Sequence, residues 1–97
     1  MFQNEEIMET LINNLNALLA NSGVDLDDAM HAARLHSSNT DSNSYLTIWY
    51  NSESENYVLI WVYVNNYDMV AVLDAEVEDV AETLNEAKKL FADFFRG

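Results

Sequence analysis

The chain has 97 residues, no cysteine and a formal net charge of -13, with 17 acidic and four basic side chains. Its length predicts a single domain over residues 1–97, and a hydrophobic content of 49% excludes intrinsic disorder. The absence of cysteine excludes a disulfide framework and thiolate chemistry. Binding to nucleic-acid phosphates and to anionic membranes depends on basic groups, so we expect neither direct nucleic-acid nor membrane binding.

The first predicted element is a helix over residues 4–21. Apolar residues recur at spacings of three and four from Ile7 to Leu19, which is typical of an amphipathic helix. Asn4 is placed as an N-cap, and Gly23 can end the helix in the left-handed conformation. This start lacks the basic residues of a signal peptide, and no apolar run approaches the ~20 residues of a membrane span, so we expect a cytoplasmic protein.

A short second helix is predicted over residues 25–36, with Asp25 as its cap, followed by a polar loop over 37–44. Three strands are then predicted from β-branched and aromatic residues, over 45–50, 57–64 and 69–73. Their short connections require antiparallel neighbours, which makes a meander with 57–64 in the middle.

The last predicted element is a helix over residues 75–95 with Asp74 as its N-cap. The expected fold class is therefore α+β: a three-stranded antiparallel meander flanked by N- and C-terminal helices, with the short helix at 25–36 as an additional element.

The central strand, YVLIWVYV, is apolar on both faces. Because alternate side chains of a strand point to opposite faces, Val58 and Ile60 lie on one face and Trp61 and Tyr63 on the other. The helices can cover both faces, a second copy can cover one, or one face can bind a foreign partner. We expect the third strand to place Val72 on the face of Trp61. Aromatic residues are enriched in interface cores, so the candidate partner- or dimer-binding side chains on this face, unless they are ordinary core, are Tyr50, Tyr57, Trp61 and Tyr63.

No catalytic motif is present, so we expect no enzymatic activity, no cofactor and no metal. Only His31 and His36, with Asp27 and Asp28 nearby, resemble a metal-binding set, and surface histidines beside helix-capping acids explain that pattern as well.

Acidic residues are the outstanding feature. On the predicted last helix, Glu78, Glu82 and Glu86 recur every four residues and form one outward stripe. Carboxylates about 6 Å apart on a rigid face can imitate a phosphate backbone, although a solvated helix face explains the stripe as well. With the acids of the two predicted turns, the candidate partner-binding residues are Glu53, Glu55, Asp68, Glu78, Glu82 and Glu86.

In size, acidity and predicted architecture the chain resembles the small inhibitors that phages and mobile elements use against host defence, namely anti-CRISPR proteins and DNA-mimic antirestriction proteins. The features that carry the resemblance are the ratio of 17 acids to four bases, the stripe Glu78, Glu82 and Glu86, and the turn with Glu53 and Glu55. The resemblance implies a non-enzymatic inhibitor that blocks the basic nucleic-acid-binding surface of a defence effector such as a CRISPR–Cas complex. It also implies the host cytoplasm, if a phage encodes the chain.

The chain also resembles small acidic secretion chaperones, because its central predicted strand is apolar on both faces. This resemblance implies a homodimeric chaperone or adaptor that uses an apolar sheet face. The order of elements is also similar to double-stranded-RNA-binding domains, but the basic cluster that those domains need is missing.

Overall fold

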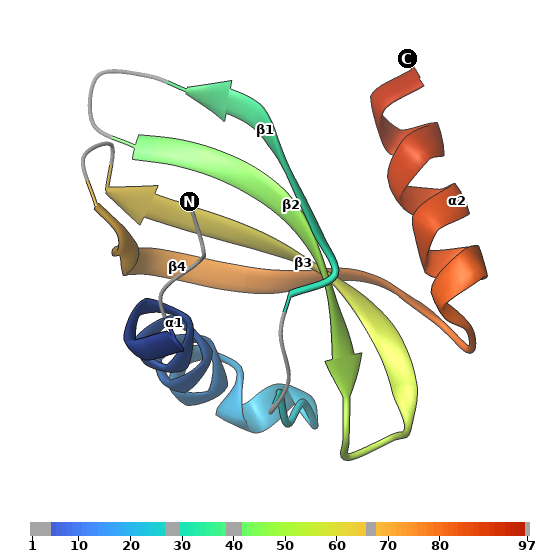
Figure 1. The fold of residues 1–97 in the computed structure, drawn as a ribbon, viewed down its shortest axis with the longest axis horizontal. Helices are drawn as coiled ribbons and strands as arrows, with labels where there is room; N and C mark the ends of the chain where they lie inside the picture. Colours follow the sequence, from blue (N-terminus) through green and yellow to red (C-terminus); the bar gives the residue numbers. More distant parts are fainter. Residues whose placement is uncertain (1–4, 27–29, 39–41, 66–67, 97) are drawn as a thin grey trace.

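The computed structural model shows a four-stranded antiparallel sheet with one helix on each side (Figure 1). It describes residues 5–26, 30–38, 42–65 and 68–96. The strands lie in the sheet in chain order, β1-β2-β3-β4. The predicted α+β class is confirmed, but the predicted three strands are one too few. The elements in chain order are α1 (Glu5–Leu18), the 3-10 turn η1 (Ala20–Ser22), β1 (Ala32–Ser38), β2 (Ser42–Asn51), β3 (Asn56–Asn65), β4 (Asp68–Ala81) and α2 (Leu84–Arg96).

Helix α1 confirms the predicted N-terminal helix, with η1 continuing its last turn. The inward positions Leu11, Leu15 and Leu19 are buried, as the spacing of three and four requires. Gly23 follows with φ 70°, a left-handed conformation that glycine adopts without steric cost. The predicted cap Asn4 lies outside the described residues.

The predicted helix over residues 25–36 is wrong, because the chain from Ala32 onward forms the edge strand β1. Ala32 pairs with Ile48 and Leu35 pairs with Tyr45, so β1 extends the sheet beside β2. Ala, Arg and Leu are strong helix formers, but helix propensity is outweighed here by hydrogen bonding to the neighbouring strand β2. The predicted loop over 37–44 shrinks for the same reason, since residues 37–38 and 42–44 are strand residues.

The predicted antiparallel pairing of residues 45–50 with residues 57–64 is confirmed by β2 and β3. Tyr50 pairs with Tyr57 and Asn51 pairs with Asn56, so four residues form the turn. This register places Trp49 and Val58 on one face of the sheet, and Ile48 and Leu59 on the other.

The predicted helix start at residue 75 is wrong, because β4 continues to Ala81, which pairs with Tyr57. The long apolar β3 needs a partner along its whole length, and β4 alternates polar and apolar residues from Asp74 to Val77 as a strand requires. Asp74 is therefore a strand residue, not a cap. Thr83 caps α2 instead, because its Oγ1 accepts a hydrogen bond from the Glu86 N–H at 3.1 Å.

Bulges in β4 change which face its side chains take. Leu59 pairs with Asp79 and Ile60 with Val77, so Glu78 is an extra residue in β4. A second shift leaves Leu73 unpaired and moves Val72 to the α1 side, where it packs on the core. The prediction that Val72 shares the face of Trp61 is wrong, since a slip of one residue turns a side chain to the other face.

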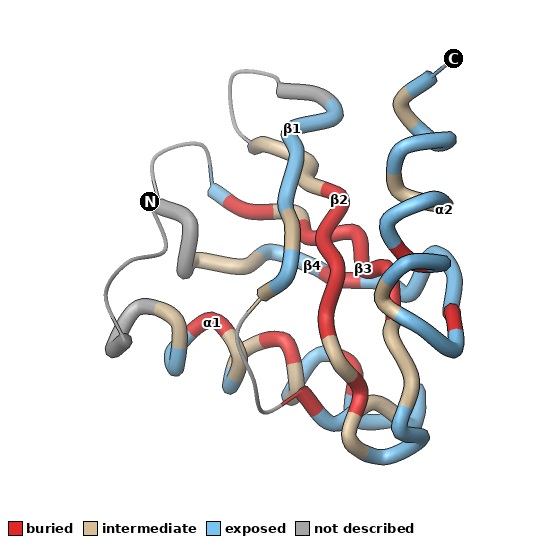
Figure 2. The backbone as a smooth tube through the Cα atoms, turned by 45° about the vertical axis from the view of Figure 1, so that its right-hand side comes forward, coloured by how far each residue is buried: buried red, intermediate tan, exposed pale blue. Residues whose placement is uncertain are grey.

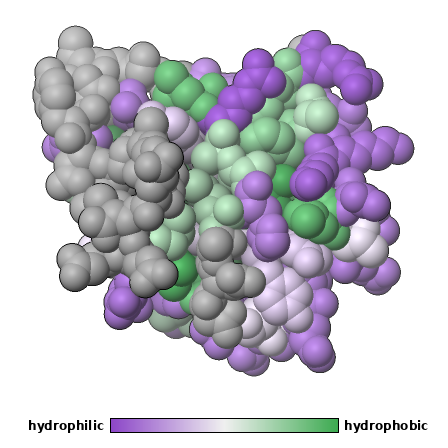
Figure 3. Space-filling model, in the orientation of Figure 1, coloured by the Kyte–Doolittle hydropathy of each residue, from purple (hydrophilic) through white to green (hydrophobic). Residues whose placement is uncertain are grey.

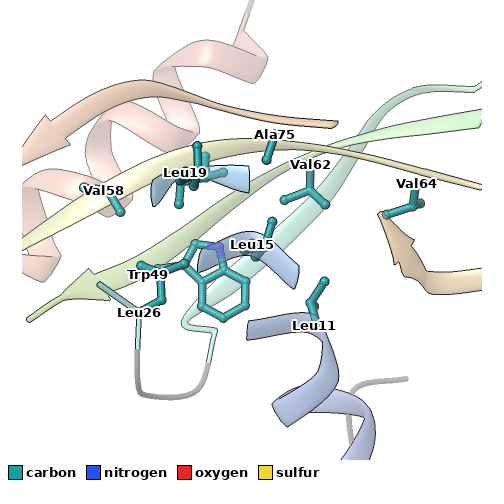
Figure 4. Close-up of a cluster of buried hydrophobic side chains, with 10 residues drawn as sticks. Leu11, Leu15, Leu19, Leu26, Trp49, Val58, Val62, Val64 and Ala75 are labelled. Carbon is teal, nitrogen blue, oxygen red and sulfur yellow. The ribbon is translucent and has the colours of Figure 1, made fainter. Parts of the chain in front are cut away.

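Both faces of β3 are buried beneath the chain's own helices. On the α1 side, Leu11 and Leu15 pack with Trp49 and the valines of β3 (Figure 4). On the α2 side, Ala87 packs in a second cluster with Leu46, Ile48, Leu59, Trp61 and Ala81. The buried residues accordingly concentrate in β2 and β3 (Figure 2). Within the described residues, neither helix is long and apolar enough to cross a membrane.

Two buried polar side chains are hydrogen-bonded within this packing. Thr47 Oγ1 accepts a bond from Trp49 Nε1 and donates one to the Ile60 carbonyl, both at 2.7 Å. Asn51 Oδ1 accepts bonds from the Asp25 and Glu53 N–H groups at 2.9 and 3.1 Å. Asn51 thereby fastens the segment after α1 to the β2–β3 turn, because a buried amide without partners would be costly.

We expect Leu15→Ala to lower the free energy of unfolding by about 2–5 kcal/mol, because Leu15 is 0% exposed and its removal leaves a cavity. Leu18→Ala is the matched control on the same helix, since Leu18 is 45% exposed and should change stability by no more than about 0.5 kcal/mol. Urea unfolding of both variants measures the difference. Equal losses would contradict the placement of α1 on the sheet.

Candidate functional site

The structure distributes the predicted acidic residues over four segments of the chain. Glu53 and Glu55 are exposed in the β2–β3 turn, Glu82 is exposed in the bend before α2, and Glu86 is exposed in the first turn of α2. The predicted helical stripe is wrong, because Glu78 lies on β4 and Glu82 precedes the helix. Asp68 is the first residue of β4, and its side chain lies outside the described part of the molecule.

A row of carboxylates on β4 takes the place of the helical stripe. Asp74 pairs with Tyr63 and Glu76 pairs with Trp61, so both acids lie on the aromatic face of the sheet. Glu78 joins them through the bulge. We refer to Asp74, Glu76 and Glu78 as the β4 acidic row, of which only Glu78 was among the candidates predicted from the sequence.

Aromatic donors hold two of the three carboxylates. Trp61 Nε1 donates a hydrogen bond to Glu78 Oε1 at 2.7 Å, and the Tyr63 hydroxyl donates one to Glu76 Oε1 at 2.8 Å. Hydrogen bonds to a carboxylate are stronger than those between neutral groups. Two charges of the β4 acidic row, those of Glu76 and Glu78, are therefore held in place rather than free to rotate.

The four predicted aromatic residues share one face of the sheet, but they form two separate groups. Trp61 lies near Tyr63, with ring centroids 6.5 Å apart, and Tyr50 lies near Tyr57 at 5.3 Å. Trp61 is 7% exposed beneath α2, where it also contacts Phe94, so its ring belongs to the core. Tyr63, Tyr50 and Tyr57 are half-buried at the border of that core.

The bases of the chain lie elsewhere. The Arg34 guanidinium stacks over the Phe95 ring at 4.5 Å, and Arg96 pairs with Asp93 at 3.4 Å. Within the described residues, no ion pair joins a base to the β4 acidic row. Hydrophilic side chains line the α2 side of the molecule (Figure 3). The row thus faces solvent with its negative charge uncompensated by a direct partner.

The acidic row changes the chemistry of Tyr63. Burial raises the pKa of Tyr63 from 10.0 to about 12, together with its hydrogen bond to Glu76 and the charges of Glu76, Asp74 and Glu78. Since this pKa is higher than in the unfolded chain, the neutral phenol stabilises the fold below pH 10. That contribution is lost as the pH rises from 10 to about 12.

The two histidines contact aromatic rings. His31 lies 5.4 Å from Tyr57, and His36 lies 4.9 Å from Trp61, measured between ring centroids. Among the residues that the structure describes, no three side chains of histidine, aspartate or glutamate come together as a group that could hold a metal ion. Asp27 and Asp28, which the sequence placed near His31, lie outside those residues.

Comparison with known proteins assigns no family: no family model, curated protein or solved structure matches the chain.

We expect Glu76→Gln to lower the pKa of Tyr63 from about 12 toward 10.0, because the variant keeps a hydrogen-bond acceptor but removes the nearest negative charge. Absorbance titration of tyrosine ionisation measures the shift, and Tyr63→Phe identifies the transition that belongs to this residue. Glu9→Gln, on the exposed side of α1, is the control and should leave the titration unchanged. An unshifted Tyr63 in Glu76→Gln would contradict the contact.

Proposed function

We propose that this chain is a non-enzymatic inhibitor that binds the basic nucleic-acid-binding surface of another protein. The observation that supports this function most is the run from Asp74 to Glu86, which has six exposed acidic residues and no base. It comprises the β4 acidic row together with Asp79, Glu82 and Glu86. Such a surface attracts a cationic partner and repels nucleic acid.

The spacing of the carboxylates in the β4 acidic row suits binding to a basic surface better than it suits an exact imitation of DNA. Asp74 and Glu76, as alternate residues of a strand, are roughly 6.7 Å apart along its axis, whereas one DNA strand carries a charge about every 3.4 Å. The row therefore has about half the linear charge density of a DNA strand. The acids at the β2–β3 turn and at the start of α2 extend the negative surface beyond the row.

Fixed carboxylates strengthen the proposal. Binding immobilises flexible side chains at an entropic cost, and groups that are already held lose less. Glu76 and Glu78 are held by Tyr63 and Trp61, whose rings are themselves packed against the sheet or α2. This preorganisation distinguishes the row from acids that serve solubility alone.

The partner class follows from the chemistry of the surface. RNA-guided nucleases hold nucleic acid in a positively charged channel, which a rigid acidic domain of 11.1 kDa can enter. A defence effector such as a CRISPR–Cas complex is therefore the target that we propose. The alternative, a homodimeric chaperone, needs an accessible apolar sheet face, and the face with Trp61 lies beneath α2. For that reason the inhibitor is the function we propose.

The proposal is tested with the triple variant Asp74→Asn, Glu76→Gln and Glu78→Gln. We expect the unmodified chain to displace labelled DNA from RNA-guided nucleases, measured by fluorescence anisotropy, and its inhibition to weaken as salt is added. The triple variant should inhibit at least tenfold less, because it keeps the hydrogen-bond acceptors but loses three negative charges, two of which are held by aromatic donors.

The matched control removes three exposed acids elsewhere, with Glu9→Gln, Asp25→Asn and Asp93→Asn. It has the same net charge as the triple variant and should inhibit nearly as well as the unmodified chain. An equal loss of inhibition in both variants would mean that inhibition depends on net charge alone and not on the position of the β4 acidic row. If neither the chain nor its variants inhibited any of a panel of such nucleases at low salt, the proposed function would be overturned.

A further inference from the structure

The two edges of the sheet differ in charge and in regularity. The β4 edge carries the acidic row, Asp79 and three register irregularities, which are features that prevent one sheet edge from pairing with another. The β1 edge has one register irregularity, between Leu35 and Ser37, but it has no acidic residue between Met30 and Ser38 and carries Arg34, one of the four bases of the chain. An edge strand with fewer irregularities and no acidic residue is the better template for pairing with a further strand.

The side chains of β1 are open to solvent. Residues 33–36 are all exposed, and the tube of β1 is correspondingly pale along most of its length (Figure 2). Leu35 is 47% exposed and pairs with Tyr45 on the side of the sheet that carries α1. Helix α1 packs against the opposite edge strand, β4, so this part of the sheet is left without a helix over it.

We propose that β1 binds a second copy of this chain, so that two β1 strands pair antiparallel and two sheets form one continuous sheet of eight strands. The charge distribution argues for this occupant. Two copies of a chain with net charge -13 repel each other, and the repulsion is smallest where each presents an edge without acids.

A two-fold axis through Leu35 makes the pairing self-complementary and closed. Each Leu35 then lies opposite Leu35 of the second copy, where the Cβ atoms of paired strand residues are about 4.5–5.5 Å apart. A contact made by one seven-residue strand is smaller than the standard interface of about 800 Å² per partner. The dimer that we infer is therefore reversible and forms as the protein concentration rises.

Sedimentation velocity over a dilution series tests the inference, which does not rest on the proposed function. The unmodified chain should shift from its monomer mass of 11.1 kDa toward twice that mass as concentration increases. Added salt should strengthen the dimer, since it screens repulsion between copies, which is the opposite of its expected effect on inhibition.

The variant Leu35→Glu should remain a monomer throughout, because it places two like charges opposite each other. The matched control is Leu73→Glu on β4, where a leucine that is 57% exposed receives the same charge and dimerisation should persist. A monomer at every concentration and salt would overturn the inference. Equal dimerisation of Leu35→Glu and the unmodified chain would overturn it as well.

Discussion

The rest of this structure depends on the need to cover both faces of β3. Residues 58–62 are all buried, and each large apolar side chain among them contributes roughly 1.5–3 kcal/mol when it leaves water. A chain of 97 residues has few elements with which to do this. Helix α1 takes the face with Ile60 and α2 takes the face with Trp61, and β2 and β4 cover the two sides.

This arrangement decides where charge can lie. Neither β2 nor β3 has an acidic residue, and both are central strands. The acids whose side chains the structure describes are all exposed, and they lie in α1, after η1, in the β2–β3 turn, in β4, in the bend before α2 and in α2. On β4 they also serve the fold, because Glu76 and Glu78 satisfy the polar groups of Tyr63 and Trp61 at the border of the α2 core. Strand β4 thus provides hydrogen-bond acceptors for the aromatic face and also carries the charges of the proposed inhibitor.

Much of the fold could be predicted from the sequence where the residue pattern of a segment favours the same secondary structure as its tertiary contacts. The run YVLIWVYV and its hairpin with β2 are examples, and so is the periodicity of α1. Residues 32–36 and 75–81 could not be assigned in the same way. Their helical spacing is real, but they form strands because β2 and β3 each need a partner. The alternation from Asp74 to Glu78 was the signal for β4, in competition with the helical spacing of Val77, Val80 and Ala81.

The candidate site was predicted only in outline. Glu78 and Trp61 were both among the predicted residues, but their hydrogen bond depends on the bulge at Glu78, which no local pattern announces. Asp74 and Glu76 were missed because residues 74–76 were assigned to a helix start. The face shared by Tyr57, Trp61 and Tyr63 was predicted because it follows from strand alternation, whereas the place of Tyr50 on that face also depends on the register of the hairpin.

The central claim is that α1 and α2 cover opposite faces of β3, and nuclear Overhauser contacts between side chains test it most directly. Contacts of Ala87 with Leu59 and Trp61, together with contacts of Leu15 with Trp49 and Ile60, are the predicted result. Contacts of Ala87 with Ile60 or Trp49 would place both helices on one face. That result, or the absence of any contact between α2 and the sheet, would contradict the account.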